Sequence, residues 1–235
     1  MPYSDNPAFE PPKPGTLWRY VSIDKFLAML VDRALFFSRL DHLGDPLEGS
    51  YSLKNLELRP EWYGEAYEEL RDLIPAASQL FRRQVFVSCW YASQYESQAM
   101  WQLYAAQARG VAIRSTVDRL AHSIKDPRLV FLADVTYADL ATDAIPEDNF
   151  FFPALIKHRS FAHEHEVRAL ASDFDEPQPT GPGFNVTVDL AVLVEAIVVA
   201  PRAPDYYLRT LRSLVERYGL TAPVEPSGIP GAPID

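Results

Sequence analysis

The sequence predicts an α+β fold, with a mixed or mainly antiparallel sheet and flanking helices in a single domain. Three observations predict this class. Strand-like and helix-like segments are interspersed without the regular βαβ rhythm of a doubly wound sheet. No glycine-rich phosphate loop occurs among the 10 glycines. The chain has 235 residues, 48% of them hydrophobic, which is enough to bury one large core.

The two ends of the chain are rich in proline. Residues 1–15 therefore predict an N-terminal lead-in, and residues 220–235 predict a C-terminal tail. Residues 16–219 contain no internal repeat, and we expect them to form the single domain.

The domain begins with a predicted strand, helix and strand. Residues 17–20 are apolar and aromatic, as in a short strand, and Ser22 is a typical N-cap for a helix. Four apolar residues then recur at helical spacing: Phe26, Leu27, Leu30 and Val31. Residues 34–38 return to an extended, aromatic pattern.

A turn and a surface helix are expected next. Residues 44–46, Gly-Asp-Pro, mark the turn. The acidic segment 61–72 predicts a helix in which Tyr63, Tyr67 and Leu70 face inward.

The middle of the chain predicts strand, helix, strand and helix. Residues 84–90 are a candidate buried strand, and Ser93 followed by Glu96 is a capping-box pattern that opens a helix. Gly110 ends that helix. One stripe of the helix is apolar or aromatic and consists of Met100, Trp101, Tyr104 and Ala105. Residues 111–113 predict a strand. Ser115 or Thr116 then caps a helix that carries Leu120 and Ile124.

The last third alternates short elements. Extended, apolar or alternating patterns predict strands at residues 129–137, 164–172 and 186–188, and a short helix is predicted at 150–158. Residues 197–200 are apolar enough for a central strand. A final helix is expected from about 205 to 218, before Gly219, with coil over 223–233.

Composition limits the possible partners. A net charge of −10 and a pI near 5.0 argue against extended contact with nucleic acid and favour a small nucleotide or a protein partner. No apolar stretch approaches the ~20 residues of a membrane helix, and residues 1–15 do not resemble a secretory signal. A single cysteine, Cys89, forbids an internal disulfide and excludes thiolate zinc clusters. We expect a cytoplasmic protein without membrane contact.

Polar side chains concentrate most strongly at residues 157–170. If this segment is a strand, its period of two places Glu164, Glu166 and Arg168 on one face, where two carboxylates share a surface with one guanidinium. The alternative is a solvated strand face whose like charges Arg168 relieves.

A second polar concentration lies at residues 37–49. Asp41, His42, Asp45 and Glu48 could supply ligands to a metal, although their spacing is not a known ligand pattern. Asp45 precedes Pro46 and is equally an ordinary turn residue.

Several single residues have both a functional and a structural interpretation. Ser88 and Cys89 could emerge as nucleophiles at a strand end, or be buried core residues. Trp101 and Tyr104, with Met100, could line a pocket for a base, or pack in the core. Arg19, between two aromatic residues, either stacks on them, holds an anion or forms an exposed ion pair.

The order and spacing of several short motifs resemble a bacterial family known as domain of unknown function 2971, over roughly residues 17–205. The motifs are Leu17-Trp18-Arg19-Tyr20, Phe36-Phe37-Ser38, Asp45-Pro46-Leu47-Glu48, Val87-Ser88-Cys89-Trp90, Met100-Trp101, Tyr104, Gly110-Val111-Ala112-Ile113, Val135-Thr136-Tyr137 and Glu164-x-Glu166-Val167-Arg168. The family name implies no activity.

A looser resemblance is to ADP-ribosyltransferases, which have a basic residue on an early strand, a serine on a second strand and Glu-x-Glu on a later one. The resemblance implies that Arg19 grips NAD, Ser38 supports the site and Glu166 is the catalytic glutamate. Glu164 would help to activate or orient an unknown acceptor. Residues 37–39 lack the fuller serine-threonine-serine form of the middle motif, so Ser88 competes with Ser38 for its role. NAD would be the substrate, and no metal is expected.

Three alternatives remain open. The chain could bind a nucleotide or another small molecule without turnover, in a pocket shaped by Trp90, Trp101 and Tyr104. It could be a metal-dependent hydrolase or nuclease acting in phage defence, with these acidic residues: Asp41, Asp45, Glu48 and Glu166. It could also be an interaction protein in phage defence or toxin–antitoxin biology.

Overall fold

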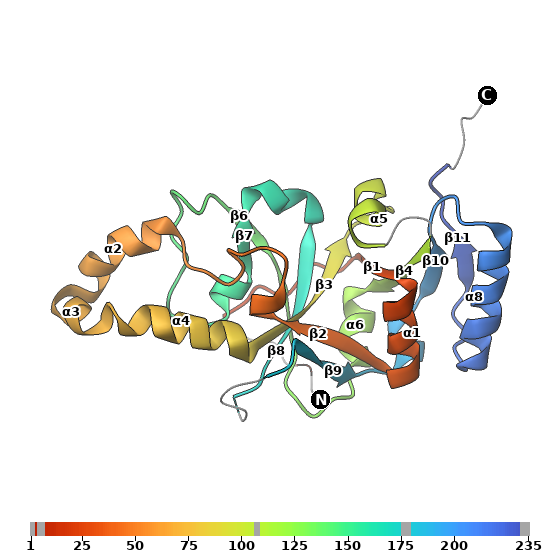
Figure 1. Cartoon of the computed structure of the whole chain (residues 1–235), viewed down its shortest axis with the longest axis horizontal. Helices are drawn as coiled ribbons and strands as arrows, with labels where there is room; N and C mark the ends of the chain where they lie inside the picture. Colours follow the sequence, from red (N-terminus) through yellow and green to blue (C-terminus); the bar gives the residue numbers. More distant parts are fainter. Residues whose placement is uncertain (1–2, 4–7, 106–108, 175–179, 231–235) are drawn as a thin grey trace.

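A computed structural model describes residues 3, 8–105, 109–174 and 180–230. It confirms the predicted α+β class, because a mixed, mostly antiparallel sheet lies among helices (Figure 1). The main path of the sheet runs β11-β10-β4-β1-β3-β2-β9, with β8 beside β3 and β5 beside β8. Among the described residues, no helix is both long enough and apolar enough to cross a membrane.

The strands of the main sheet are short and mostly antiparallel. They are β1 (Thr16–Ser22), β2 (Ala34–Arg39), β3 (Val85–Ala92), β4 (Gly110–Thr116), β5 (Phe131–Asp134), β8 (Glu166–Ser172), β9 (Gly183–Thr187), β10 (Ala196–Val199) and β11 (Val224–Pro226). Parallel pairing joins β10 to β11. A separate parallel pair is formed by β6 (Thr136–Ala138) and β7 (Ile156–His158).

The α-helices lie around this sheet. They are α1 (Ile23–Asp32), α2 (Leu53–Tyr63), α3 (Tyr67–Leu70), α4 (Leu73–Gln84), α5 (Gln98–Tyr104), α6 (Val117–Ser123), α7 (Leu190–Leu193) and α8 (Asp205–Arg217). Short 3₁₀ segments include Leu40–His42, Gly64–Ala66, Phe152–Ala154 and Arg159–Glu164.

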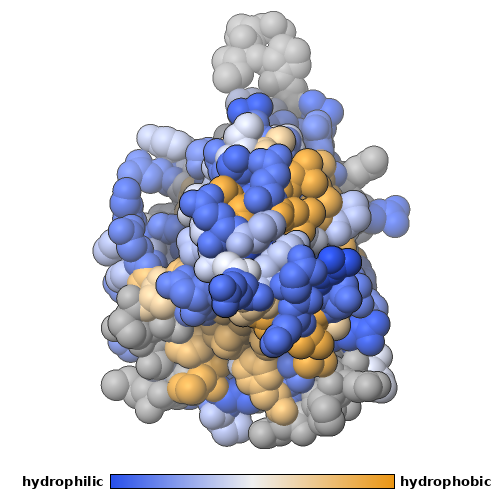
Figure 2. All heavy atoms as spheres, turned by 90° about the vertical axis from the view of Figure 1, so that its left-hand side faces the viewer, coloured by the Kyte–Doolittle hydropathy of each residue, from blue (hydrophilic) through white to orange (hydrophobic). Residues whose placement is uncertain are grey.

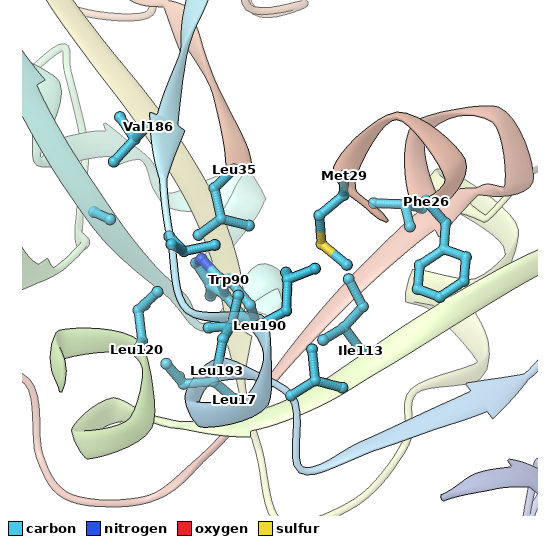
Figure 3. Close-up of a cluster of buried hydrophobic side chains, with 14 of the residues drawn as sticks. Leu17, Phe26, Met29, Leu35, Trp90, Ile113, Leu120, Val186, Leu190 and Leu193 are labelled. Atoms are coloured by element: carbon cyan, nitrogen blue, oxygen red, sulfur yellow. The ribbon is translucent and has the colours of Figure 1, made fainter. Parts of the chain in front are cut away.

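Alternation along β1 shows how the sheet is buried on both faces. Leu17 and Val21 join one large apolar cluster, whereas Trp18 and Tyr20 join another beneath α5. The first cluster holds the main core, between the sheet and several helices. Figure 3 shows part of it, in which these side chains meet: Leu17, Phe26, Met29, Leu35, Trp90, Ile113, Leu120, Val186, Leu190 and Leu193.

Strand β3 is the point at which the sheet divides. One edge of β3 pairs with β8 over 85–91. Its other edge pairs with β2 at 86–87 and with β1 at 91–92. Residues 88–90 therefore have no strand partner on that edge, and β1 and β2 separate there. This opening positions the site described below.

The first half of the sequence contains a long helical arm that the sequence predicted wrongly. The arm consists of α2, α3 and α4. The single helix expected over 61–72 is interrupted at Gly64, whose φ of 53° ends α2. Helix α2 begins before this segment, and α4 follows it. Ser52 and Asn55 form a capping box that starts α2. The fully buried Asn55 amide also binds Ile145 and Glu147, which attaches the arm to the body.

The arm projects from the body of the molecule (Figure 1), and much of its surface is exposed. Apolar patches lie among charged residues on the side of the molecule that carries it (Figure 2). The exposed large apolar side chains of the arm are Leu53, Leu56, Trp62, Leu73 and Leu80. The apolar periodicity is weak in α2, whereas in α4 partly buried apolar residues recur at helical spacing: Ile74, Ala77 and Phe81.

The expected capping box at Ser93 and Glu96 is also wrong. Ser97 caps α5 by accepting the N–H of Met100 at 3.3 Å. Glu96 instead accepts the indole N–H of Trp101 (2.9 Å), the hydroxyl of Ser227 (2.6 Å) and the N–H of Gly228 (2.7 Å). Glu96 therefore fastens the C-terminal segment to α5, and the coil expected over 223–233 includes strand β11.

Three further expectations differ from the structure. The strand predicted over 129–137 is two strands, β5 and β6, in different sheets, and the helix over 150–158 is a 3₁₀ turn followed by β7. The strand predicted from 164 begins at Glu166, because His165 has a left-handed φ of 38°. The other predicted helices and strands are present with small shifts of their ends, and Thr116 is the residue that caps α6.

Candidate functional site

A cavity of about 890 Å³ lies where β1 and β2 separate. Polar side chains from six strands or turns line it, together with Tyr104 of α5: Arg19, Ser38, Glu48, Cys89, Glu164 and Glu166. This volume falls within the range of roughly 300–1,000 Å³ that is typical of small-molecule sites.

Arg19 is the cation on the β1 side of the cavity. Its guanidinium donates to the hydroxyl of Ser88 and, at 3.1 Å, to the carbonyl of Phe36, and it lies over the ring of Trp90. Burial lowers the pKa of Arg19 from 12.5 to about 10, so the side chain stays charged at neutral pH. No carboxylate of the described chain lies within ion-pair distance of Arg19. The half-buried charge is therefore available to an anionic ligand.

Glu166, at the start of β8, is held by a fully buried arginine two residues further along the strand. Arg168 Nε donates to Glu166 Oε1 at 2.7 Å and Nη2 donates to Oε2 at 3.2 Å. The same guanidinium donates to Glu48 at 2.6 Å and to the carbonyl of Ala154 at 2.5 Å. The backbone N–H of Glu166 donates to the hydroxyl of Tyr137 at 2.8 Å. These contacts fix the position of the carboxylate.

Lys157, from β7, is a second cation that contacts the carboxylates of the site. Its ammonium group donates to Glu164 at 2.5 Å and to Glu166 at 3.3 Å, and lies 3.8 Å from Glu48. Burial opposes the charge of Lys157, but Glu166 and Glu164 raise its pKa overall. The half-exposed Tyr104 donates its hydroxyl to Glu164 at 2.5 Å. Three carboxylates thus face two cations, and the cluster carries one net negative charge.

The environment keeps Glu166 ionised. Burial tends to raise its pKa, but the charge and hydrogen bonds of Arg168, followed by Lys157, lower the pKa from 4.5 to about 2. The carboxylate is therefore an anion throughout the physiological pH range and is not a proton donor.

This depressed pKa predicts a loss of stability in acid. Glu166 binds fewer protons in the folded state, so its contribution is fully present above about pH 5 and is lost as the pH falls through the folded pKa of about 2. We expect the free energy of unfolding to fall by about 2 kcal/mol between pH 5 and pH 3 from this group alone. Urea denaturation across that range checks this, with Glu166→Gln as the variant whose slope should be shallower. Equal slopes would contradict the assignment.

Cys89 of β3 lines the same cavity as Arg19 and Glu166. Burial, and then the charge of Glu166, raise the pKa of the Cys89 thiol, which keeps it protonated and poorly nucleophilic.

The structure brings most of the sequence-predicted site residues to this cavity. Its lining includes Arg19, Ser38, Tyr104, Glu164 and Glu166. Glu164 reaches it from the 3₁₀ turn before β8 and not from a shared strand face. Ser88 is buried and contacts Arg19 directly, whereas the Ser38 hydroxyl donates to the carbonyl of Arg39 at 3.4 Å.

Trp101 and Asp41 are not among the residues that line the cavity, whereas Asp45 and Glu48 line it. Trp101, on α5, is buried against Tyr20 in the core, which is the structural alternative that the sequence left open. Asp41 pairs with Arg39 at 2.6 Å, and Asp45 accepts the N–H of Leu47 at 2.9 Å as a turn residue. Within the described ranges, no group of three or more His, Cys, Asp or Glu side chains is arranged to hold a metal ion.

The sequence did not identify the contacts that hold the carboxylates. Glu48, considered as a metal ligand and as part of a family-like motif, is 120 positions from its partner Arg168. Lys157 stood out in the sequence only as one of several basic residues. Tyr137 accepts the N–H of Glu166. Its place in the family-like motif Val135-Thr136-Tyr137 was the only sign in the sequence that it has a role in the site.

Comparisons with known proteins give two distant likenesses. No family model and no curated protein matches the chain, so the resemblance to domain of unknown function 2971 stays a prediction. Thermus sp. 2.9 DarT in complex with NAD+ is 10% identical, with a TM-score of 0.43 over 92% of this chain and 97% of that one. The same protein in complex with carba-NAD+ is 8% identical, with a TM-score of 0.41 over 92% and 96%. At these values the likeness assigns neither an activity nor a site residue to this chain.

Proposed function

We propose that this protein is an enzyme that cleaves the nicotinamide–ribose bond of NAD and transfers the ADP-ribosyl group to an acceptor. Arg19 binds the phosphates of the dinucleotide, and Glu166 stabilises the ribosyl cation. The observation that carries the proposal is that one cavity is lined by a guanidinium with no carboxylate partner among the described residues, and by a carboxylate held ionised.

Cleavage of the nicotinamide–ribose bond needs a negatively charged group near the ribose carbon that reacts. It does not need an acid to protonate the leaving group. Nicotinamide in NAD carries a positive charge and leaves as a neutral ring with the electron pair of the glycosidic bond, so no proton has to be donated to it. The positive charge that develops on the ribose is stabilised by a fixed carboxylate nearby. Glu166 fits this task because Arg168 and Lys157 keep it ionised and fixed in place.

The acceptor side of the reaction favours Glu164 and Tyr104. An acceptor that attacks the ribose carbon must lose a proton, and Glu164 lines the same cavity as Glu166. One of its oxygens accepts from Tyr104 and the other from Lys157, and these contacts set the position of the carboxylate. Tyr104 is 46% exposed, so an acceptor entering from solvent would meet it first.

The test is release of nicotinamide from NAD by the purified protein, with cell extract present to supply acceptors. For Arg19→Gln we expect the KM for NAD to rise roughly 10- to 100-fold, because a charged hydrogen bond to phosphate is lost. Arg71→Gln is a matched control, since Arg71 is exposed on the arm and, in the described part of the chain, forms ion pairs with Glu68 and Asp72 alone. Folded wild-type protein that releases no nicotinamide would contradict the proposed activity. An unchanged KM in Arg19→Gln would contradict the role of Arg19.

A second candidate is nucleotide binding without turnover. It is favoured by one observation, that both oxygens of Glu166 are already engaged by Arg168 and Lys157 as in a structural ion network. This candidate shares the requirement for Arg19 but predicts that Glu166 is dispensable for binding, with no nicotinamide released.

A further inference from the structure

The cavity extends away from the Glu166 cluster to an end bounded by α1, β2 and β9. One face of β2 lines it with Ala34, Phe36 and Ser38. Four residues on one side of α1 line it as well: Lys25, Ala28, Met29 and Asp32. Arg19 connects the two ends, because its guanidinium binds Ser88 on one side and the carbonyl of Phe36 on the other.

Phe36 presents an uncovered aromatic ring at this end. It is 45% exposed although its neighbours Leu35 and Phe37 are buried in the core. Its ring lies against Gly183 on the adjacent strand, where a Cβ atom would come within 2.6 Å of the ring. The lack of a side chain at Gly183 therefore sets where the ring rests. An exposed, positioned ring in a cavity is suited to stacking against a planar base.

Hydrogen-bond acceptors flank the ring. Asn185 lies directly opposite Phe36 in the β2–β9 register, and its amide donates to Asp32 at 2.9 Å. Within the described chain, the Oδ1 atoms of Asp32 and Asn185 receive no hydrogen bond. The pair therefore offers acceptors to a base that carries an exocyclic amino group.

We propose that this end of the cavity binds the adenosine portion of the dinucleotide, with the purine stacked on Phe36 and its amino group donating to Asp32 and Asn185. The inference rests on the proposed function and adds to it the direction in which the substrate lies. The phosphates then fall at Arg19, and the nicotinamide ribose falls at Glu166.

The test separates the two halves of the substrate. Calorimetric titration measures binding of ADP-ribose, which lacks nicotinamide, and of nicotinamide mononucleotide, which lacks adenosine. We expect Phe36→Ala to weaken ADP-ribose binding about 10-fold or more, as loss of a stacked base does, while nicotinamide mononucleotide binding stays within about 2-fold. Phe174→Ala is the matched control, because Phe174 is 48% exposed and does not line the cavity. ADP-ribose binding is also measured for Phe36→Leu, which keeps an apolar side chain but removes the ring, so that stacking is separated from simple apolar contact.

Each outcome decides one of the two proposals. ADP-ribose binding that is unchanged in Phe36→Ala, or an equal loss for both ligands, overturns the adenosine site and leaves the proposed activity standing. A wild-type protein that binds neither ligand nor NAD overturns both. Hypoxanthine in place of adenine replaces the amino group by an oxygen, and it should weaken binding to the wild type but not to Asp32→Ala.

Discussion

Glu166→Gln is expected to lower the rate of nicotinamide release by ~10²–10³-fold, the cost of removing one fixed electrostatic contact to a transition state. Glutamine keeps the shape of the side chain but carries no charge to stabilise the ribosyl cation. Binding of ADP-ribose should change little, because the proposed function assigns the phosphates to Arg19 and not to Glu166. The measurement is nicotinamide release at saturating NAD, with ADP-ribose affinity measured on the same preparation.

The control for this prediction comes from the same cluster. Glu48→Gln also removes a carboxylate that accepts from Arg168, and Glu48 is as deeply buried as Glu166. If damage to the ion network were the cause of lost activity, both variants would lose it equally. We expect Glu48→Gln to retain release within about 10-fold. Equal losses would reassign Glu166 to a structural role.

Arg168→Met is expected to have the largest effect on stability, a loss of about 3–5 kcal/mol in the free energy of unfolding. Arg168 is 0% exposed, and its removal leaves the buried carboxylates of Glu48 and Glu166 with Lys157 as their remaining cation. Uncompensated charge in a buried site costs far more than the packing that methionine retains. Urea denaturation at pH 7 measures the change.

An exposed ion pair provides the comparison. Arg71 contacts Glu68 at 3.1 Å on the exposed arm, and Arg71→Met should cost less than about 1 kcal/mol. Combining Arg168→Met with Glu48→Leu should recover part of the loss, because the double variant buries one charge fewer. If the double variant is less stable than Arg168→Met alone, charge imbalance is not the cause.

The sequence predicted the sheet well because its strands are buried in a regular pattern. In β1, Leu17 and Val21 alternate with Trp18 and Tyr20, and each set packs in its own cluster. The same alternation placed Glu166 and Arg168 on one face of β8, where the structure finds them paired. Local regularity is therefore enough to find the centre of the candidate site.

The arm and the full charge cluster could not be predicted for two physical reasons. The apolar periodicity of α2 is weak, and Gly64 ends α2 inside the acidic segment 61–72, which the sequence predicted to be one helix. The cluster depends on long-range contacts: Glu48 and Arg168 meet across 120 residues, and Glu164 reaches Lys157 only because His165 turns the chain. Such contacts leave no local pattern.

The attachment of the C-terminal segment to Glu96 has a consequence for the synthesis of this protein. Glu96 lies 131 residues before Ser227, and the indole of Trp101 shares its carboxylate. A chain leaving the ribosome from its N-terminus exposes Glu96 and the aromatic layer under α5 long before Ser227 emerges. Completion of this layer must therefore wait until Ser227 and Gly228 have been synthesised, and a chain released before residue 227 would leave Glu96 without these two partners.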